Sequence, residues 1–432
     1  MLYSTMRNSL LSLLIFIGII GSFAGTLSSN PNKKFKLEYK KITSGPANHF
    51  FGYIGHVQNI PWNGNGRYIL SLRTKFQDRM PGPDDPADII LIDTHQNYSI
   101  RKLDETCAWN PQQGTMFYWN PKSPDTQFFF NDRDKESGEI FCVLFDISEG
   151  ENGIRIKEYR YTDSPIGNGG VAQKGGNFLG INYARMARLR PVTGYKGASD
   201  WTVNSKHPEN DGIFKVDVST GNKNLLVSFK TLASKLSKKH DPKKIPSLFI
   251  NHTLWNREDD RIFFFARAGW SGNRKGTKIN QPFVMNSDGS NLKLLKQHIG
   301  GHPEWSYDKK MIGRSGKLQI VYDTEKQIIV NSLGTPEIFP DPEGDIALSP
   351  NGEWLVNGYK NKKQKKNFYV IYNLKNKFHL RSKGFEIGKW ISGDLRQDPS
   401  PTWNRNNNQI MIPALSDDGK SRQLHTISIV QE

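Results

Sequence analysis

A repeated pattern of an aromatic residue, a turn and an apolar strand constrains the fold of this 432-residue chain most. Each copy starts with Trp, or once with Ser, passes through a turn rich in Asn, Asp, Gly and Pro, and ends in an apolar run. The clearest copies are PWNGNGRYIL, YWNPKSPDTQFFF, LWNREDDRIFFF, EWSYDKKMIG, ALSPNGEWLV and TWNRNNNQIMI, and VAQKGGNFLGINY is a degraded seventh copy. The spacing averages about 57 residues, slightly more than one four-stranded propeller blade needs.

A second unit of strand, turn and strand follows each copy, as in ADIILIDTHQNYSI and NFYVIYNLKNKFHL. The last unit, RQLHTISIV, stops after one strand, while KFKLEYKKI near the N-terminus alternates like an edge strand and has no repeat of its own. We therefore predict that residues 33–432 form one all-β domain, a seven-bladed β-propeller whose ring is closed by pairing of the N- and C-terminal strands. Two β-sandwiches are the alternative.

The repeat Trp residues are expected to be structural. A Trp side chain that is buried between blades needs a hydrogen-bond partner for its indole N–H. We therefore do not assign these residues to sugar stacking.

The first 24 residues predict a signal peptide. Arg7 is followed by the short apolar run 10–20 and by the small residues Ser22 and Ala24. This pattern predicts a periplasmic or secreted protein without membrane association after cleavage, and an uncleaved anchor is the alternative. We separately predict that the protein is a monomer. In an oxidising compartment Cys107 and Cys142 could pair, or each could be a small buried hydrophobe.

The formal net charge of +17 favours an anionic partner. For an exported protein this indicates an acidic polysaccharide or oligosaccharide rather than nucleic acid. Part of the excess lies in two Lys-rich runs, SKLSKKHDPKK and KNKKQKKN. Both are interpreted as solvated loop faces rather than binding sites.

Polar residues that precede the repeat Trp residues should meet around the propeller axis. His56 lies next to Gly55 and six residues before Trp62, so it is the least structural of the candidate histidines and the predicted catalytic residue. His252 and His302 each lie three residues before a Trp, where a structural link between blades is equally expected. The predicted substrate-binding residues are Gln113, Tyr183, Arg185, Arg188, Arg190, His252, His302 and Arg396. Arg188 and Arg190 alternate along a strand-like run and should share one face.

The motifs present point to acid–base chemistry on an acidic sugar. No metal-binding pattern, phosphate loop or nucleophile elbow is found, so no metal or cofactor is predicted. No convincing carboxylate pair for ordinary glycoside hydrolysis precedes the repeats. Arg, His and Tyr suit elimination next to a uronate, and a hydrolysis centred on His56 is the other option.

Several segments together resemble the seven-bladed propeller α-L-rhamnosidases that act on L-rhamnose-α-1,4-D-glucuronate. They are HFFGYIGHVQNIPWNGNGRYIL, AWNPQQGTMFYWNP, FFFNDRD, NYARMARLRPVTGYKG, INHTLWN and GGHPEW. The resemblance runs from about residue 49 to the end, and the family is similar to rhamnose–glucuronate lyases and ulvan lyases. It implies that His56 matches the essential histidine of the rhamnosidases. Gln113 and Arg133 stand where the lyases carry histidines, which counts against a lyase.

The sequence therefore predicts an exported α-L-rhamnosidase that releases rhamnose from rhamnosyl-glucuronic acid ends of glycans such as arabinogalactan. His56 would be the main acid–base residue, and the Arg cluster would hold the uronate. Two alternatives are a polysaccharide lyase acting by β-elimination next to a uronate, and a propeller that binds glycans without catalysis.

Overall fold

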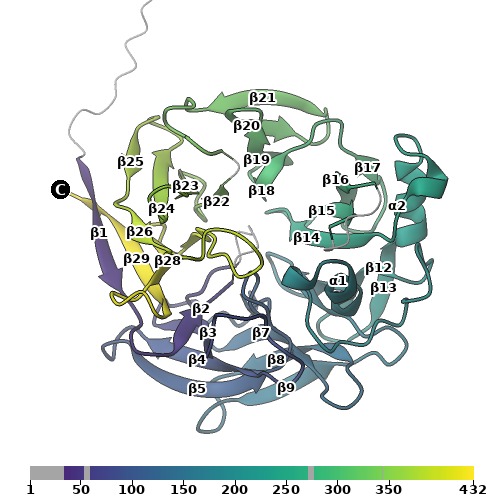
Figure 1. Cartoon of the computed structure of the whole chain (residues 1–432), viewed down its shortest axis with the longest axis horizontal. Helices are drawn as coiled ribbons and strands as arrows, with labels where there is room; N and C mark the ends of the chain where they lie inside the picture. Colours follow the sequence, from purple (N-terminus) through teal and green to yellow (C-terminus); the bar gives the residue numbers. More distant parts are fainter. Residues whose placement is uncertain (1–33, 53–58, 271–276, 343) are drawn as a thin grey trace, which may run out of the picture. The chain divides into compact units, whose positions relative to one another are not determined.

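The computed structural model describes residues 34–52, 59–270, 277–342 and 344–432. Within residues 35–432 small antiparallel sheets are arranged around a common centre, with strands such as β14 and β18 directed toward it (Figure 1). The predicted signal peptide (1–24) and the predicted catalytic His56 both lie outside the described residues. In the part of the chain that is described, no helix is long and apolar enough to cross a membrane.

Five sheets have four strands each. The first contains β2 (Asn48–Phe50), β3 (Tyr68–Thr74), β4 (Ala87–Asp93) and β5 (Ser99–Thr106). The second contains β6 (Tyr118–Trp119), β7 (Gln127–Arg133), β8 (Ile140–Asp146) and β9 (Ile154–Tyr159). The third contains β10 (Gly167–Val171), β11 (Asn177–Ile181), β12 (Gly212–Asp217) and β13 (Lys223–Ser228). The fourth contains β14 (Phe249–Trp255), β15 (Arg261–Ala268), β16 (Ile279–Asn286) and β17 (Lys293–Leu294). The last contains β27 (Thr402–Trp403), β28 (Gln409–Leu415), β29 (Arg422–Gln431) and β1 (Phe35–Lys41).

The remaining described strands form one nine-stranded sheet. Its first part is β18 (Gly300–Trp305), β19 (Lys310–Ser315), β20 (Leu318–Asp323) and β21 (Ile328–Leu333). Its second part is β22 (Asp345–Leu348), β23 (Trp354–Asn361), β24 (Lys366–Asn373), β25 (His379–Arg381) and β26 (Phe385–Glu386). The described helices are α1 (Tyr183–Leu189), η1 (Pro191–Thr193), α2 (Phe229–Leu236) and η2 (Pro242–Lys244).

The all-β propeller prediction is confirmed, but the prediction of seven blades is wrong. Hydrogen bonding divides the described strands into five four-stranded sheets and one nine-stranded sheet. The larger sheet arises because β18 and β22 meet through a parallel bridge between His302 and Asp345. A hydrogen bond between the same two side chains also links these strands at the centre.

The predicted closure of the ring by terminal strand pairing also needs correction. β1 does pair with β29 along its whole length, but this pairing adds an edge strand to the last four-stranded sheet. Separate polar contacts link that sheet with the first one. Thr43 Oγ1 donates to Gln423 Oε1 at 2.7 Å, and the N–H of Arg422 donates to Asn48 Oδ1 at 3.0 Å.

Four of the repeat Trp residues are buried and bonded to the repeat before them, in agreement with the structural role predicted from the sequence. The indole N–H groups of Trp119, Trp255, Trp305 and Trp403 donate to the carbonyls of Pro61, Gly170, Leu254 and Ala347, at 2.8 to 3.1 Å. Each acceptor belongs to the preceding repeat, so every bond satisfies a buried indole N–H and sets the position of the next sheet.

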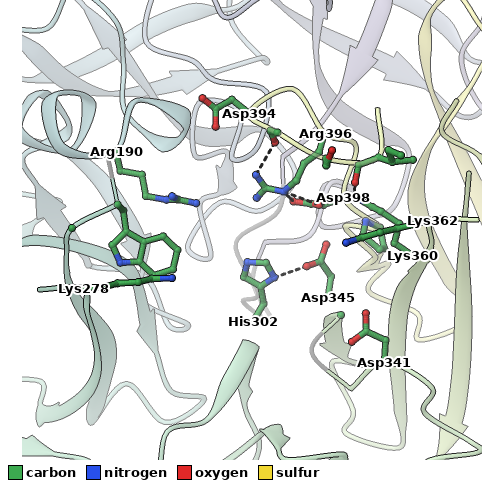
Figure 2. A pocket seen from close by; sticks show the side chains of 17 residues that line it. Arg190, Lys278, His302, Asp341, Asp345, Lys360, Lys362, Asp394, Arg396 and Asp398 are labelled. Atoms are coloured by element: carbon green, nitrogen blue, oxygen red, sulfur yellow. Dashed lines mark hydrogen bonds and ion pairs between the residues drawn. The ribbon is translucent and has the colours of Figure 1, made fainter. Parts of the chain in front are cut away.

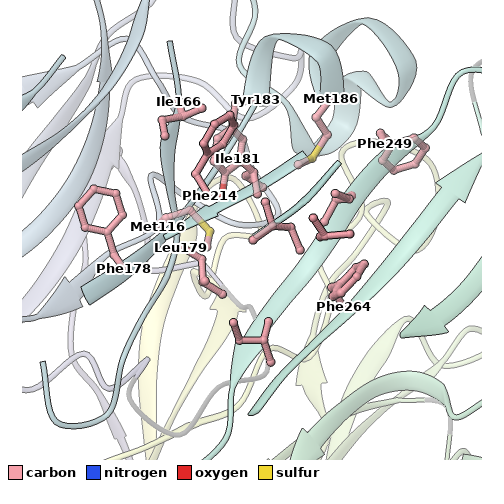
Figure 3. Close-up of a cluster of buried hydrophobic side chains, with 14 of the residues drawn as sticks. Met116, Ile166, Phe178, Leu179, Ile181, Tyr183, Met186, Phe214, Phe249 and Phe264 are labelled. Atoms are coloured by element: carbon pink, nitrogen blue, oxygen red, sulfur yellow. The ribbon is translucent and has the colours of Figure 1, made fainter. Parts of the chain in front are cut away.

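Apolar side chains fill the spaces between neighbouring sheets. The largest cluster lies among the second, third and fourth sheets and beneath α1, where Met116, Phe178, Phe214 and Phe264 are buried (Figure 3). Cys142 belongs to this cluster, and Cys107 is buried elsewhere; both are free thiols. They therefore follow the second of the two readings of the sequence, as small buried hydrophobes.

Candidate functional site

A cavity of about 510 Å³ opens beside the bridge between β18 and β22. Its walls come from the end of α1, the segment after β15, β22 and β23, and the loop between β26 and β27. The lining is strongly charged, with five cationic residues (Arg190, Lys278, Lys360, Lys362 and Arg396) and four aspartates (Asp341, Asp345, Asp394 and Asp398). Figure 2 shows Arg190 and Lys278 on one side of His302, with the two lysines of β23 and its turn on the other.

The part-buried His302 and the buried Asp345 form an acid–base pair at the cavity wall. His302 Nδ1 is in direct contact with Asp345 Oδ1, and the N–H of Ser400 donates to Asp345 Oδ2 at 2.8 Å. Burial alone would raise the pKa of Asp345, but His302 and the Ser400 N–H outweigh it and the pKa is lowered. A carboxylate held in this way fixes the orientation of the imidazole and directs Nε2 away from Asp345.

Asp398 is engaged by two cations. Its carboxylate accepts from Arg396 Nε at 2.9 Å and from Lys360 Nζ at 3.2 Å. Gln112 donates to the carbonyl of Arg396 at 2.9 Å, which ties this loop to the loop before β6. Asp398 is therefore part of the frame of the cavity, and two of the five cations are partly neutralised.

Three cations that form no ion pair with a described carboxylate lie around the ring of Trp270. Lys278 Nζ and the guanidinium carbons of Arg190 and Arg267 lie 4.1, 4.6 and 5.1 Å from its ring centroid. The face of an indole ring attracts cations, so several positive charges can lie close together here. Among the described residues, Arg190, Arg267 and Lys278 form no ion pair with a carboxylate. This side of the site therefore carries positive charge that no ion pair in the described part of the chain neutralises, although Asp394 and Asp398 lie near enough to Arg190 to favour its charged form.

A smaller chamber of about 50 Å³ continues inward from the cavity. Arg190, His302, Arg396 and Asp398 line both spaces. The chamber adds four residues of its own that the argument needs: Gln113, Asn251, His252 and Arg267. The ring centroids of His252 and His302 are 4.9 Å apart, and Gln113 Nε2 donates to Asn251 Oδ1 at 3.4 Å.

Irregular strand geometry brings both histidines to this place. The pairing of β14 with β15 shifts register between Asn251 and Leu254, and His252 adopts a φ of 57°. The pairing of β18 with β19 shifts between Gly300 and Glu304, on either side of His302. Such bulges redirect side chains and are frequent next to functional sites. Both histidines thus face the centre instead of following the alternation of a regular strand.

The structure gathers five of the predicted site residues: Gln113, Arg190, His252, His302 and Arg396 all line the chamber. Three others lie elsewhere. Tyr183 is buried, stacks on Tyr195 and donates to the carbonyl of Asn168. Arg188 pairs with Asp200 at 2.8 Å. Arg185 is fully buried and donates to the carbonyls of Leu248, Ser205 and Lys206.

The predicted strand through Arg188 and Arg190 is wrong, because residues 183–189 form the helix α1. Asn182 caps this helix by accepting from the N–H of Arg185 at 2.8 Å. Helical spacing places Arg185 and Arg188 three residues apart on one side, against the loop around Thr202. Arg190 comes after the helix end and lines the cavity instead. Arg133, which the resemblance had compared with a lyase histidine, donates to the carbonyl of Asp134 and lies outside both spaces.

Sequence reasoning missed the aspartate partner of His302, two of the three cations around Trp270 (Arg267 and Lys278), and the lysines of β23 and its turn. Asp345 precedes the repeat copy that begins at Ser349, much as His302 precedes Trp305, so position in the repeat could have found it. The second Lys-rich run was interpreted as a solvated loop face. Lys360 and Lys362 from that run line the cavity instead.

Comparison with solved structures supports the propeller fold. No protein-family profile and no curated protein sequence matches the chain. An oligogalacturonate lyase from Vibrio parahaemolyticus has a TM-score of 0.58 at 14% identity, over 92% of this chain and 97% of that one. An oligogalacturonate lyase in complex with manganese gives the same values. A structure from work on two prolyl endopeptidases has a TM-score of 0.50 at 9% identity, over 89% of this chain and 48% of that one.

At these identities the likeness shows the fold alone. None of these structures is a rhamnosidase, so the comparisons add nothing specific to that prediction. The manganese of one lyase raises the question of a metal site here. Among the described residues no three His, Cys, Asp or Glu side chains gather in a way that could hold a metal ion. The described side chains therefore do not fit a bound metal ion.

Proposed function

We propose that this protein is a polysaccharide lyase that cleaves acidic oligosaccharides next to a uronate by β-elimination. The observation that carries this proposal is the His302–Asp345 pair at the wall of a large cavity that has cations without a described ion-pair partner on its other side. Two of the structures with the same fold are oligogalacturonate lyases, which supports this assignment over a rhamnosidase. In line with the sequence, the protein would act outside the cytoplasm as a monomer and would need an acidic glycan as its partner.

The residues of the cavity supply the two roles that start an elimination. A cation next to the substrate carboxylate stabilises the negative charge that develops as the C5 proton leaves. Arg190, which is part-buried and directed toward His302 in Figure 2, is placed for this role. His302 Nε2 is the proposed base, with Asp345 stabilising the imidazolium that forms. The C5–H electron pair forms the C4–C5 double bond, the C4–O bond breaks, and the leaving oxygen takes a proton from water.

A hydrolysis with two carboxylates is less consistent with the same residues. Its general acid must be a carboxyl group whose pKa is raised, so that it still carries a proton near neutral pH. The pKa of Asp345 is lowered instead, because His302 and Ser400 outweigh the effect of burial. Asp398 is held by Arg396 and Lys360. Neither group is suited to donate a proton to a leaving sugar.

The test is an incubation with oligogalacturonate, in which an unsaturated uronate product is followed by its ultraviolet absorbance. The wild-type protein should form this product, and His302→Gln should reduce the rate by about 10²-fold or more, as expected for removal of a general base. His95→Gln, which changes an exposed hairpin turn outside both spaces, is the matched control and should keep full activity. Equal rates for His302→Gln and wild type would refute the assigned base.

The α-L-rhamnosidase activity with His56 as its acid–base residue stays as the second candidate. Its support is the resemblance of the sequence, and His56 itself lies outside the described residues. Free rhamnose from gum arabic, with no rise in ultraviolet absorbance and with loss of activity in His56→Ala, would favour it over the lyase. Binding of either glycan without any product would favour a non-catalytic glycan-binding propeller.

A further inference from the structure

The small chamber behind His302 has features of an anion site that is sized for one functional group. Its volume of about 50 Å³ compares with the roughly 10–15 Å³ that a cavity needs to hold one water molecule. A carboxylate fits such a space, whereas a sugar ring does not. The ring of a bound sugar would therefore remain in the 510 Å³ cavity while one of its substituents enters the chamber.

The most buried cation of the chamber is Arg267, which is 7% exposed. Its Nε donates to Asn280 Oδ1 at 2.8 Å, and its guanidinium packs on Phe265. In the part of the chain that is described it has no carboxylate partner, and the only charge that acts strongly on it is another cation, Arg190. Burial first and Arg190 second lower the pKa of Arg267 to about 9, so it remains protonated at neutral pH. A buried cation without a counter-charge is costly unless an anion binds to it.

Two further polar groups of the chamber lack a hydrogen-bond partner. Gln113 is 5% exposed, and its Oε1 is buried without a donor. Arg190 Nε is likewise buried without an acceptor. Gln113 Oε1 can accept a hydrogen bond from a hydroxyl donor of a bound ligand, while its Nε2 stays bonded to Asn251 Oδ1. Buried polar groups are nearly always paired in folded proteins, so these two also point to a missing ligand.

We propose that Arg267 and Arg190 form a pocket for the free carboxylate of a uronate, and that Arg267 determines specificity for the free acid over its ester. The inference rests on the proposed function for the identity of the sugar, and it deepens that function by defining the substrate. A methyl ester carries no charge to neutralise Arg267 and adds a methyl group in a space with little room. An ester-hydrolysing reaction would therefore have to precede this enzyme on any esterified polymer.

Direct binding tests this pocket without relying on turnover. The probes are D-galacturonate and D-glucuronate, with methyl D-galacturonate ester and D-galactose as uncharged counterparts, measured by calorimetry or ligand-observed NMR. The wild-type protein should bind at least one free acid about 10-fold or more tightly than its uncharged counterparts, since charge-assisted pairs in buried sites are strong. Arg267→Gln should lose this preference. Arg160→Gln, a change of an exposed arginine after β9, is the matched control and should retain it.

The outcomes separate the pocket from the lyase assignment. A preference for the free acid that depends on Arg267, without any unsaturated product from oligogalacturonate, would support the pocket and remove the proposed function. Elimination with an unchanged free-acid preference in Arg267→Gln would support the lyase and overturn the pocket. An absence of measurable uronate binding to the wild-type protein would also overturn it.

Discussion

Arg185 and Arg267 are both buried arginines, yet their surroundings differ in kind. Arg185 donates to Thr202 and to three backbone carbonyls, and its guanidinium lies 4.5 Å from the ring of Phe229. Arg267 donates to one amide oxygen and otherwise faces a chamber lined by another cation. Burial lowers the pKa of both, to about 10 for Arg185 and about 9 for Arg267. A lowered pKa alone therefore does not identify a functional residue; the presence or absence of acceptors within the protein does.

The largest difference between the two regions is expected in stability. Arg185→Leu should lower the free energy of unfolding by about 3–5 kcal/mol, because several buried acceptors lose their donor at once. Arg267→Leu should stay within about 1 kcal/mol of wild type, since it removes a buried cation that has no counter-charge. Urea unfolding monitored by Trp fluorescence measures both. Equal losses in the two variants would mean that Arg267 is as structural as Arg185.

The pH dependence of stability should be the next largest difference between the Arg185 region and the Arg267 region. Asp211 lies beside Arg185, and burial raises its pKa to about 6 although Asn182, Arg185 and Thr202 lower it. Its folded pKa is therefore above its unfolded value near 4, so the folded state binds the extra proton between these values. Stability should fall as pH rises through this window, by about 3 kcal/mol in total at 1.4 kcal/mol per pH unit.

Asp211→Asn should remove this slope. Unfolding of wild type and variant by urea between pH 4 and 6.5 measures the difference, and the variant curve should be flatter throughout. Asp217→Asn is the control, because the pKa of Asp217 is lowered by hydrogen bonds from Ser219 and Thr220 rather than raised. Parallel curves for wild type and Asp211→Asn would show that Asp211 does not titrate as its burial implies.

The cap of α1 is a smaller test of how firmly the Arg185 region is held. Asn182→Ala should cost about 1–2 kcal/mol, because Asn182 also donates to Asp200 at 3.0 Å and to Asp211 at 2.9 Å. Ser228→Ala is the matched change at α2, where the cap accepts from the N–H of Thr231 and shares one hydroxyl–hydroxyl hydrogen bond with the same residue. A Ser228 variant that is as destabilised as the Asn182 variant would show that these extra bonds contribute little.

The contrast also shows how far the sequence could predict this molecule. The position of a residue in the repeat was informative: Gln113, His252, His302 and Arg396 precede repeat Trp residues and do line one chamber. The local spacing of side chains was less informative. Arginines at alternating positions fit a strand, but Asn182 caps a helix here. The helix separates Arg190 from Arg185 and Arg188.

Other features depend on long-range contacts that a linear pattern does not contain. The merging of two repeats into one sheet depends on His302 meeting Asp345, 43 positions away. Arg267 ends a buried strand and carries no motif, and only its neighbours in space distinguish it. The role of His56, which the sequence placed first among the catalytic candidates, stays a prediction.

The smallest effect is expected at the outer edge of the cavity, where charges are exposed to solvent. Lys362→Gln should weaken the binding of an oligogalacturonate by about two- to five-fold, because an exposed charge contributes at most about 1 kcal/mol. Lys363→Gln changes the neighbouring exposed lysine, which does not line the cavity, and should leave the dissociation constant unchanged. The Lys362 effect should disappear at high ionic strength, whereas the effect of Arg267→Gln should persist, because buried charges are screened far less. Equal salt sensitivity of both variants would place Arg267 in the same solvated environment as Lys362 and remove the distinction between chamber and outer cavity.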